Sequence, residues 1–137
     1  MIFSIFKVKF DHWFRMKISV IIPTYNGEKT IERAIRSILD QVCPCEIEIL
    51  VCDDGSTDRT IEIARQFNCR IFINENNSGG PNKGRNAGIR NATGDYLAFL
   101  DQDDEWCQGK LTEQLKHVED GAEFVYSRYI ERKKQEG

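Results

Sequence analysis

The chain has 137 residues, of which 40% are hydrophobic and 30% charged, and this length allows one domain. Nineteen basic and 22 acidic residues give a formal net charge of -3, which argues against a nucleic-acid-binding protein with its usual basic face. Its apolar runs are far shorter than the roughly 20 residues that cross a bilayer, so the sequence predicts no transmembrane segment.

Residues 1–16 differ from the rest of the chain, and we expect them to be a leader or extension. Four apolar residues recur there at three- or four-residue spacing, with basic residues among them: Ile2, Phe6, Phe10 and Trp13. This pattern is typical of a short helix that lies on a membrane surface. The alternative is that Met16 is the true start. No secretory signal is present, so we expect a cytoplasmic protein, with contact at the inner face of the membrane left open.

The chain has five cysteines and no secretory signal, which predicts reduced thiols. Cys43 and Cys45 are separated by a single proline, and no neighbouring histidine or second cysteine pair completes a zinc spacing. We therefore expect structural free thiols and no metal site built from cysteine.

From residue 17 onward, strand and helix patterns alternate. Strands are predicted at 17–23, 46–52, 70–74, 95–100 and 124–130. Helices are predicted at 28–42, at 56–67 with Ser56 as its N-cap, at 83–92 and around residues 111–118. The first helix should bury Ile31, Ala34, Ile35, Ile38, Leu39 and Val42. The alternation predicts an α/β domain over 17–130 with a mainly parallel sheet, followed by a charged tail at 131–137.

Polar residues gather in the four segments that follow the first four strands, at 23–28, 53–56, 76–83 and 101–104. Ligands of open α/β sheets bind outside the carboxyl ends of the strands. We therefore expect these four segments to converge on one site.

The last of these segments carries three carboxylates in four residues, Asp101, Asp103 and Asp104. Such groups repel one another unless a cation or water screens them. Mg²⁺ and Mn²⁺ take carboxylate and phosphate oxygens as ligands, so the pattern favours a metal–phosphate site. The alternative is an acidic turn at the start of the next helix.

The other segments offer polar and aromatic groups. The acids at 53–54 can form a turn and helix cap, or can accept hydrogen bonds from a base or ribose. Tyr25 can stack on a nucleobase or be an ordinary loop aromatic. The glycines at 79–80 allow close backbone approach to a phosphate, and Lys83 and Arg85 add positive charge at a helix start.

Four motifs occur in order: PTYN at 23–26, DDGSTD at 53–58, GRNAGI at 84–89 and FLDQDD at 99–104. Through them the chain resembles the nucleotide-sugar-binding part of a family 2 glycosyltransferase with the GT-A fold, over about residues 17–115. The resemblance implies a Rossmann-like three-layer α/β/α fold that is incomplete at the C-terminus.

The resemblance also implies the site residues. The nucleotide-sugar would be bound by Pro23, Thr24, Tyr25, Glu28, Asp54, Lys83, Arg85, Asn86, Asp101 and Gln102. In that family Tyr25 and Asp54 would hold the nucleobase. Asp103, with Asp101, would bind a divalent metal, Mn²⁺ or Mg²⁺, on the diphosphate.

The implied reaction is inverting transfer of a sugar from an NDP-sugar, expected to be a UDP-sugar, to an acceptor hydroxyl in glycan or polysaccharide synthesis. The family's general base is expected beyond Gly137, so the chain reads as truncated, weakly active or inactive alone, with an apolar edge prone to self-association. One alternative is a non-catalytic nucleotide-binding remnant or partner-dependent module. A receiver-like phosphoacceptor is the other, but its acid pair would follow the first strand rather than the second.

Overall fold

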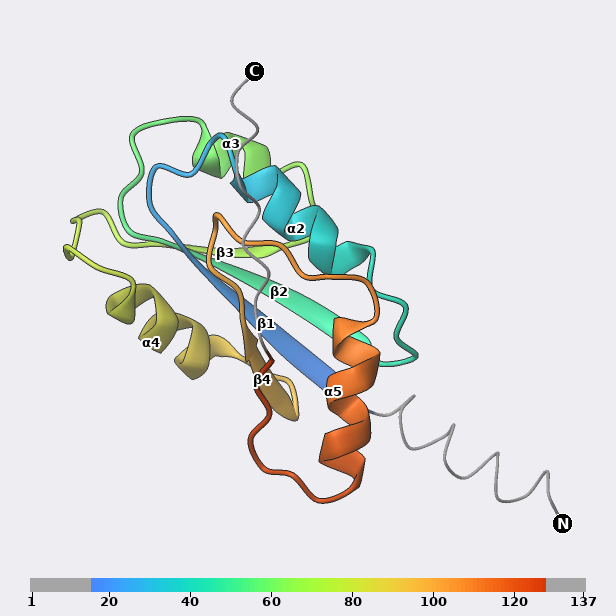
Figure 1. Cartoon of the computed structure of the whole chain (residues 1–137). Helices are drawn as coiled ribbons and strands as arrows, with labels where there is room; N and C mark the ends of the chain where they lie inside the picture. Colours follow the sequence, from blue (N-terminus) through green and yellow to red (C-terminus); the bar gives the residue numbers. More distant parts are fainter. Residues whose placement is uncertain (1–15, 128–137) are drawn as a thin grey trace, which may run out of the picture.

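The computed structural model describes residues 16–127, which form a four-stranded parallel sheet in the order β3-β2-β1-β4 (Figure 1). The strands are β1 (Lys17–Thr24), β2 (Glu46–Asp53), β3 (Arg70–Ile73) and β4 (Tyr96–Phe99). The helices are α2 (Ile31–Leu39), α3 (Thr60–Ala64), α4 (Asn82–Asn91) and α5 (Lys110–Glu119). The first four predicted strands are therefore present in the predicted order.

Strand β1 lies at the centre of the sheet, which explains its nearly continuous apolar sequence. Ile18, Val20 and Ile22 belong to the larger core, on the face covered by α2, whereas Ile21 packs with Leu50 on the other face. All five side chains are at most 2% exposed. A strand buried on both faces needs apolar residues at successive positions.

The helices form layers on the two faces of the sheet. Buried residues of α2, α3 and α5 share one core, and α4 packs on the opposite face against β1 and β2 (Figure 1). The chain moves from β1 to β3 in one direction and then crosses to β4 on the far side of β1. The predicted three-layer α/β/α class is confirmed, and the strand order reverses between β1 and β4, where such folds bind ligands.

Two details of the first predicted helix are wrong. Helix α2 buries Ile31, Ala34, Ile35 and Ile38 as expected, but it ends at Leu39. Leu39 is 53% exposed and Val42 is 86% exposed. Leu39 is the last residue of α2 and is exposed there, whereas Val42 lies beyond the helix end, where the helical periodicity no longer applies.

The second predicted helix is shorter than its pattern suggests. Helix α3 covers five residues, and Ser56 does not cap it. The Ser56 hydroxyl donates to Asp53 at 2.5 Å instead. Asp58 accepts hydrogen bonds from the Thr60 backbone N–H at 3.0 Å and from its hydroxyl at 2.5 Å, so a different residue satisfies the start of this helix.

The predicted fifth strand is not formed over residues 124–127. Phe124 and Tyr126 are 83% and 82% exposed and lie against each other, with ring centroids 6.2 Å apart. An extended segment without a hydrogen-bonded neighbour has no ladder to stabilise it. The rest of that prediction, the leader at 1–15 and the tail at 131–137 fall outside the described residues. Within the described part, no helix is long and apolar enough to cross a membrane.

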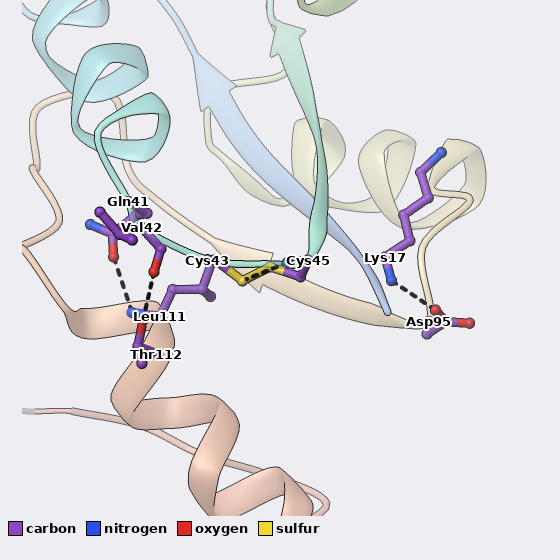
Figure 2. Close-up of a disulfide and its surroundings, with 8 residues drawn as sticks. All are labelled: Lys17, Gln41, Val42, Cys43, Cys45, Asp95, Leu111 and Thr112. Carbon is purple, nitrogen blue, oxygen red and sulfur yellow. Dashed lines mark hydrogen bonds between the residues drawn. A yellow bond between two sulfur atoms is a disulfide. The ribbon is translucent and has the colours of Figure 1, made fainter. Parts of the chain in front are cut away.

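The expectation of free thiols is wrong for two cysteines. Cys43 and Cys45 form a disulfide in the α2–β2 connection (Figure 2). The turn at Pro44 brings their Cα atoms to 5.2 Å, within the range that a disulfide requires. The residues just before the bridge also hold α5, because the Thr112 hydroxyl donates to the Val42 carbonyl at 2.8 Å. The other three cysteines are free.

Candidate functional site

The predicted loops converge at the carboxyl ends of the strands. They surround a cavity of about 420 Å³ beside the point where the strand order reverses. Its lining contains Pro23, Thr24, Tyr25, Cys52, Asp54, Asn77, Gly79, Gly80, Pro81, Gly84, Arg85, Asp101, Gln102 and Asp103. Each of the four predicted segments contributes residues.

The first acid of the 53–54 pair shapes the loop. Asp53 is 2% exposed and accepts hydrogen bonds from the backbone N–H groups of Gly55 and Ser56 at 3.0 and 2.9 Å. The Thr24 hydroxyl donates to its other oxygen at 3.3 Å. Asp53 therefore forms a turn, which was one of the two possibilities for the acids at 53–54. Its hydrogen bond with Thr24 also links the ends of β1 and β2.

The second acid faces the cavity. Asp54 is 6% exposed and accepts hydrogen bonds from the Asn74 amide at 2.8 Å and from the Ser78 N–H and hydroxyl at 2.8 and 2.9 Å. Burial works to raise the pKa of Asp54, but these hydrogen bonds, with the Lys83 charge, outweigh it and hold the pKa below its ordinary value. The carboxylate is thus ionised and acts as an acceptor.

The loop that carries Tyr25 is held in place by hydrogen bonds of the two residues that follow it. Asn26, which has a φ of 46°, donates from its N–H to the Ser56 hydroxyl at 2.8 Å and accepts from the Thr57 N–H at 2.8 Å. The neighbouring Gly27 N–H donates to the Thr60 hydroxyl at 2.7 Å. Tyr25 itself is 45% exposed and lines the cavity, so its ring is open to a ligand.

The acidic segment after β4 is partly neutralised by α4. The guanidinium of Arg85 pairs with Asp101 at 2.8 Å. Asp104 closes a turn by donating its N–H to the Asp101 carbonyl at 3.0 Å. Burial first, and then repulsion from Asp103 and Asp101, raise the pKa of Asp104. The mutual repulsion predicted from three clustered acids is therefore present.

The donor set fits a hard divalent cation only in part. Asp101 and Asp103 both line the cavity and offer carboxylate oxygens, the ligands that Mg²⁺ and Mn²⁺ prefer. Across residues 16–127, however, no group of three or more His, Cys, Asp or Glu side chains is placed to hold a metal. A metal bound here would need further oxygens from the diphosphate of its ligand, which is the usual arrangement for Mg²⁺.

Three predicted site residues lie outside the cavity lining. Glu28 accepts a hydrogen bond from the Arg59 N–H at 3.1 Å, at the start of α3. Asn86 is exposed on α4. The ammonium of Lys83 approaches the Asn74 side-chain oxygen at 3.5 Å, behind Asp54. Their proposed contacts with the ligand stay predictions.

Cys52 and Gly84 also line the cavity, although the sequence motifs did not predict them as site residues. A Cβ at position 84 would meet the Cys52 carbonyl oxygen at 3.0 Å and the Pro23 Cβ at 3.3 Å. Helix α4 therefore approaches β1 and β2 closely at its first turn. The sequence does contain a signal for Gly84. A glycine in the first turn of a helix lets the helix backbone lie close to a neighbouring strand.

A second hollow, of about 490 Å³, runs along α2 beside residues 105–108. Its charged walls include ion pairs between Arg33 and Glu105 at 3.1 Å and between Arg36 and Glu32 at 2.7 Å. Glu28 lines this hollow, but none of the other predicted site residues does. We therefore assign the site to the cavity beside Tyr25 and Asp101.

The sequence from residue 19 to 137 matches the family model described as Glycosyl transferase family 2. The chain belongs to this family. The resemblance stated on the four motifs is thereby confirmed.

Individual relatives agree with this assignment. A GalNAc(5)-diNAcBac-PP-undecaprenol β-1,3-glucosyltransferase of Campylobacter jejuni is 36% identical over 115 residues, which cover 80% of this chain and 37% of that protein. TarS, a poly(ribitol-phosphate) β-N-acetylglucosaminyltransferase of Staphylococcus aureus, is 44% identical over 94 residues, covering 65% of this chain and 16% of TarS. The family 2 chain thus spans well under half of either relative.

Solved structures confirm the GT-A fold. TarS in complex with UDP-GlcNAc superposes with a TM-score of 0.72 at 38% identity, over 77% of this family 2 chain and 32% of the TarS chain. The mannosyltransferase PcManGT of Pyrobaculum calidifontis, in complex with GDP-Man and Mn²⁺, superposes with a TM-score of 0.68 at 25% identity. The match covers 86% of this chain and 40% of the PcManGT chain.

Proposed function

We propose that this family 2 chain binds a nucleoside-diphosphate sugar, with UDP as its nucleotide, in the cavity beside β1 and β4. The observation that carries the proposal is the joint placement of Tyr25, Asp54, Arg85, Asp101 and Asp103 around one cavity. An open ring, an ionised acceptor, a guanidinium and two carboxylates are the groups that a base, a diphosphate and a metal require.

Each side chain has a role that follows from its surroundings. Tyr25 stacks on the base, and Asp54 accepts a hydrogen bond from a base N–H in place of part of its contact with Ser78. Asp101 and Asp103 hold Mn²⁺ or Mg²⁺, which when bound neutralises charge on the diphosphate. The Arg85 guanidinium, which pairs with Asp101 at 2.8 Å, would be placed to pair with a phosphate oxygen of the bound diphosphate.

The reaction served by this site is transfer of the sugar to an acceptor hydroxyl with inversion, as part of glycan or polysaccharide synthesis. Charge that develops on the leaving diphosphate is stabilised by the basic side chain and the metal. The UDP-GlcNAc bound to TarS supports uridine over other bases, and the GDP-Man bound to PcManGT makes guanosine the competing choice. An inverting transfer also needs a general base that takes the proton of the acceptor hydroxyl.

A thermal-shift titration of the full chain tests the proposal. UDP, GDP, TDP and CDP are each added with and without Mn²⁺, and a ligand at a hundredfold its Kd adds about 2.7 kcal/mol to the free energy of unfolding. We expect a Mn²⁺-dependent shift with UDP that Asp103→Ala abolishes and that Asp120→Ala leaves intact, because Asp120 is an exposed acid just after α5. A cooperatively melting chain that no nucleotide stabilises would refute the proposal.

A sugar-transfer assay then separates enzyme from binding module. Release of UDP from a UDP-sugar in the presence of an acceptor supports transfer by the chain as it stands. Nucleotide binding without turnover supports a nucleotide-binding module that works with a partner.

A further inference from the structure

The side chain of Gln102 lies between two cavity carboxylates in the sequence, but its amide is directed at another loop. The Tyr25 N–H donates to Gln102 Oε1 at 2.9 Å, and Gln102 Nε2 donates to the Tyr25 carbonyl at 2.9 Å. One side-chain amide thus pairs with both backbone groups of a residue 77 positions away. We call this pair of hydrogen bonds the Gln102–Tyr25 clamp.

Gly27 makes room for the clamp. A Cβ at position 27 would lie 2.8 Å from Gln102 Cδ and 3.3 Å from Nε2. Gly27 is not among the glycines with positive φ, so its backbone accepts an L residue. The need for glycine there comes from the Gln102 side chain, which an added methyl would push out of its place.

We propose that Gln102 is a positioning residue that sets the nucleobase platform relative to the metal-binding carboxylates. The inference rests on the proposed function, and it deepens that function by separating Gln102 from the residues that touch the ligand. With its carbonyl and amino groups both engaged on Tyr25, Gln102 acts through the backbone of that residue. The two hydrogen bonds thereby tie the loop that carries Tyr25 to the segment that carries Asp101 and Asp103.

The Gln102–Tyr25 clamp should affect the binding of UDP and of pyrophosphate differently. A nucleoside diphosphate contacts both loops and gains from their fixed separation, whereas pyrophosphate contacts only the acidic loop and the basic groups. The turn between Asp101 and Asp104 and the ion pair between Asp101 and Arg85 do not involve the Gln102 side chain, so both should remain in Gln102→Ala. Loss of the clamp should therefore weaken UDP binding and spare pyrophosphate binding.

The first measurement concerns the clamp itself, without ligand. Amide hydrogen exchange is followed by NMR in the wild-type chain, Gln102→Ala, Gly27→Ala and the double variant, with Gln66→Ala, an exposed glutamine after α3, as the matched control. We expect exchange of the Tyr25 amide to accelerate about tenfold in the first three variants and not in the control. Unchanged exchange in Gln102→Ala would overturn the clamp, whatever the ligand does.

The second measurement is calorimetric titration with Mn²⁺-UDP and with Mn²⁺-pyrophosphate. Gln102→Ala should raise the Kd for Mn²⁺-UDP about tenfold and change that for Mn²⁺-pyrophosphate by less than about twofold. Gly27→Ala should do the same, and the double variant should be no worse than either, because both changes remove one clamp.

A purely structural role for Gln102 would move both ligands together or neither, and either result overturns the positioning role. Additive losses in the double variant would also overturn it. If the wild-type chain bound pyrophosphate but not UDP, or bound neither, the proposed function would fall and the ligand role of Gln102 with it. The exchange rates would still show separately whether the clamp forms.

Discussion

Glu48 on β2 links three strands and a loop, and its charge makes the stability of the fold depend on pH. Its side chain is 11% exposed and accepts hydrogen bonds from the Ser19 hydroxyl at 2.5 Å, the Thr93 N–H at 2.6 Å and Arg70 at 3.3 Å. The Lys17 ammonium lies 3.6 Å away. Burial works to raise the pKa of Glu48, but the hydrogen bonds from Ser19 and Thr93 and the Lys17 charge lower it to about 2.

The sign of the pH dependence follows from this. The folded pKa lies below the unfolded value, so the stabilisation is complete above pH 4.5 and is lost as the pH falls toward 2. The difference between the two pKa values corresponds to roughly 3 kcal/mol of folding free energy at neutral pH. Roughly 2 kcal/mol of this is gone by pH 3.

Glu48→Gln tests this reasoning, because it keeps the shape and one acceptor oxygen while removing the charge. Urea unfolding of both chains is measured at pH 7, 5 and 3. The variant should be less stable by roughly 2–3 kcal/mol at pH 7, and the gap should shrink to below roughly 1 kcal/mol at pH 3. Glu46→Gln is the matched control: Glu46 is 68% exposed and pairs with Lys17 at the surface, so its loss should cost less than about 1 kcal/mol at every pH. A gap between wild type and Glu48→Gln that does not change with pH would refute the argument.

The remaining predictions concern packing and thiol chemistry. Gly88→Ala should lower the free energy of unfolding by about 1–3 kcal/mol, because the new Cβ would lie 2.8 Å from Cγ1 of fully buried Ile21; urea unfolding measures this. Burial raises the pKa of the Cys52 and Cys69 thiols to about 11, so at pH 7.5 iodoacetamide should label Cys107, which is exposed, and leave these two unmodified until the chain is unfolded.

Each of these two predictions has a result that would contradict it. Arg90→Ala, at an exposed position of the same helix, should change stability by less than about 0.5 kcal/mol, and an equal loss in both variants would contradict close packing at Gly88. Peptide mass mapping locates the label. Modification of Cys52 in the folded chain would contradict its burial, and modification of Cys43 or Cys45 without prior reduction would contradict the disulfide.

Much of the fold was predictable because its signals are local. The apolar run of β1 predicts a strand buried on both faces, and the polar residues directly after β1, β2 and β4 predict a site at one edge of a parallel sheet. Both predictions need only neighbouring residues and the geometry of parallel strands. The helical pattern is wrong at its C-terminal end: Leu39, the last residue of α2, is exposed, and Val42 lies beyond the helix.

The sequence by itself determined the family, the alternation of strands and helices along the chain and which loops carry polar groups, because these depend on residue type and short spacing. The order of the strands in the sheet, β3-β2-β1-β4, was decided by the tertiary structure. Tertiary structure alone decided the different roles of Asp53 and Asp54, and it decided that the Gln102 amide pairs with the backbone of Tyr25. The physical reason is that a carboxylate or amide takes its role from the donors and acceptors around it. Asp53 finds its donors in its own loop, whereas the partners of Asp54 and Gln102 come from other loops 20 to 77 residues away, which the sheet topology brings together.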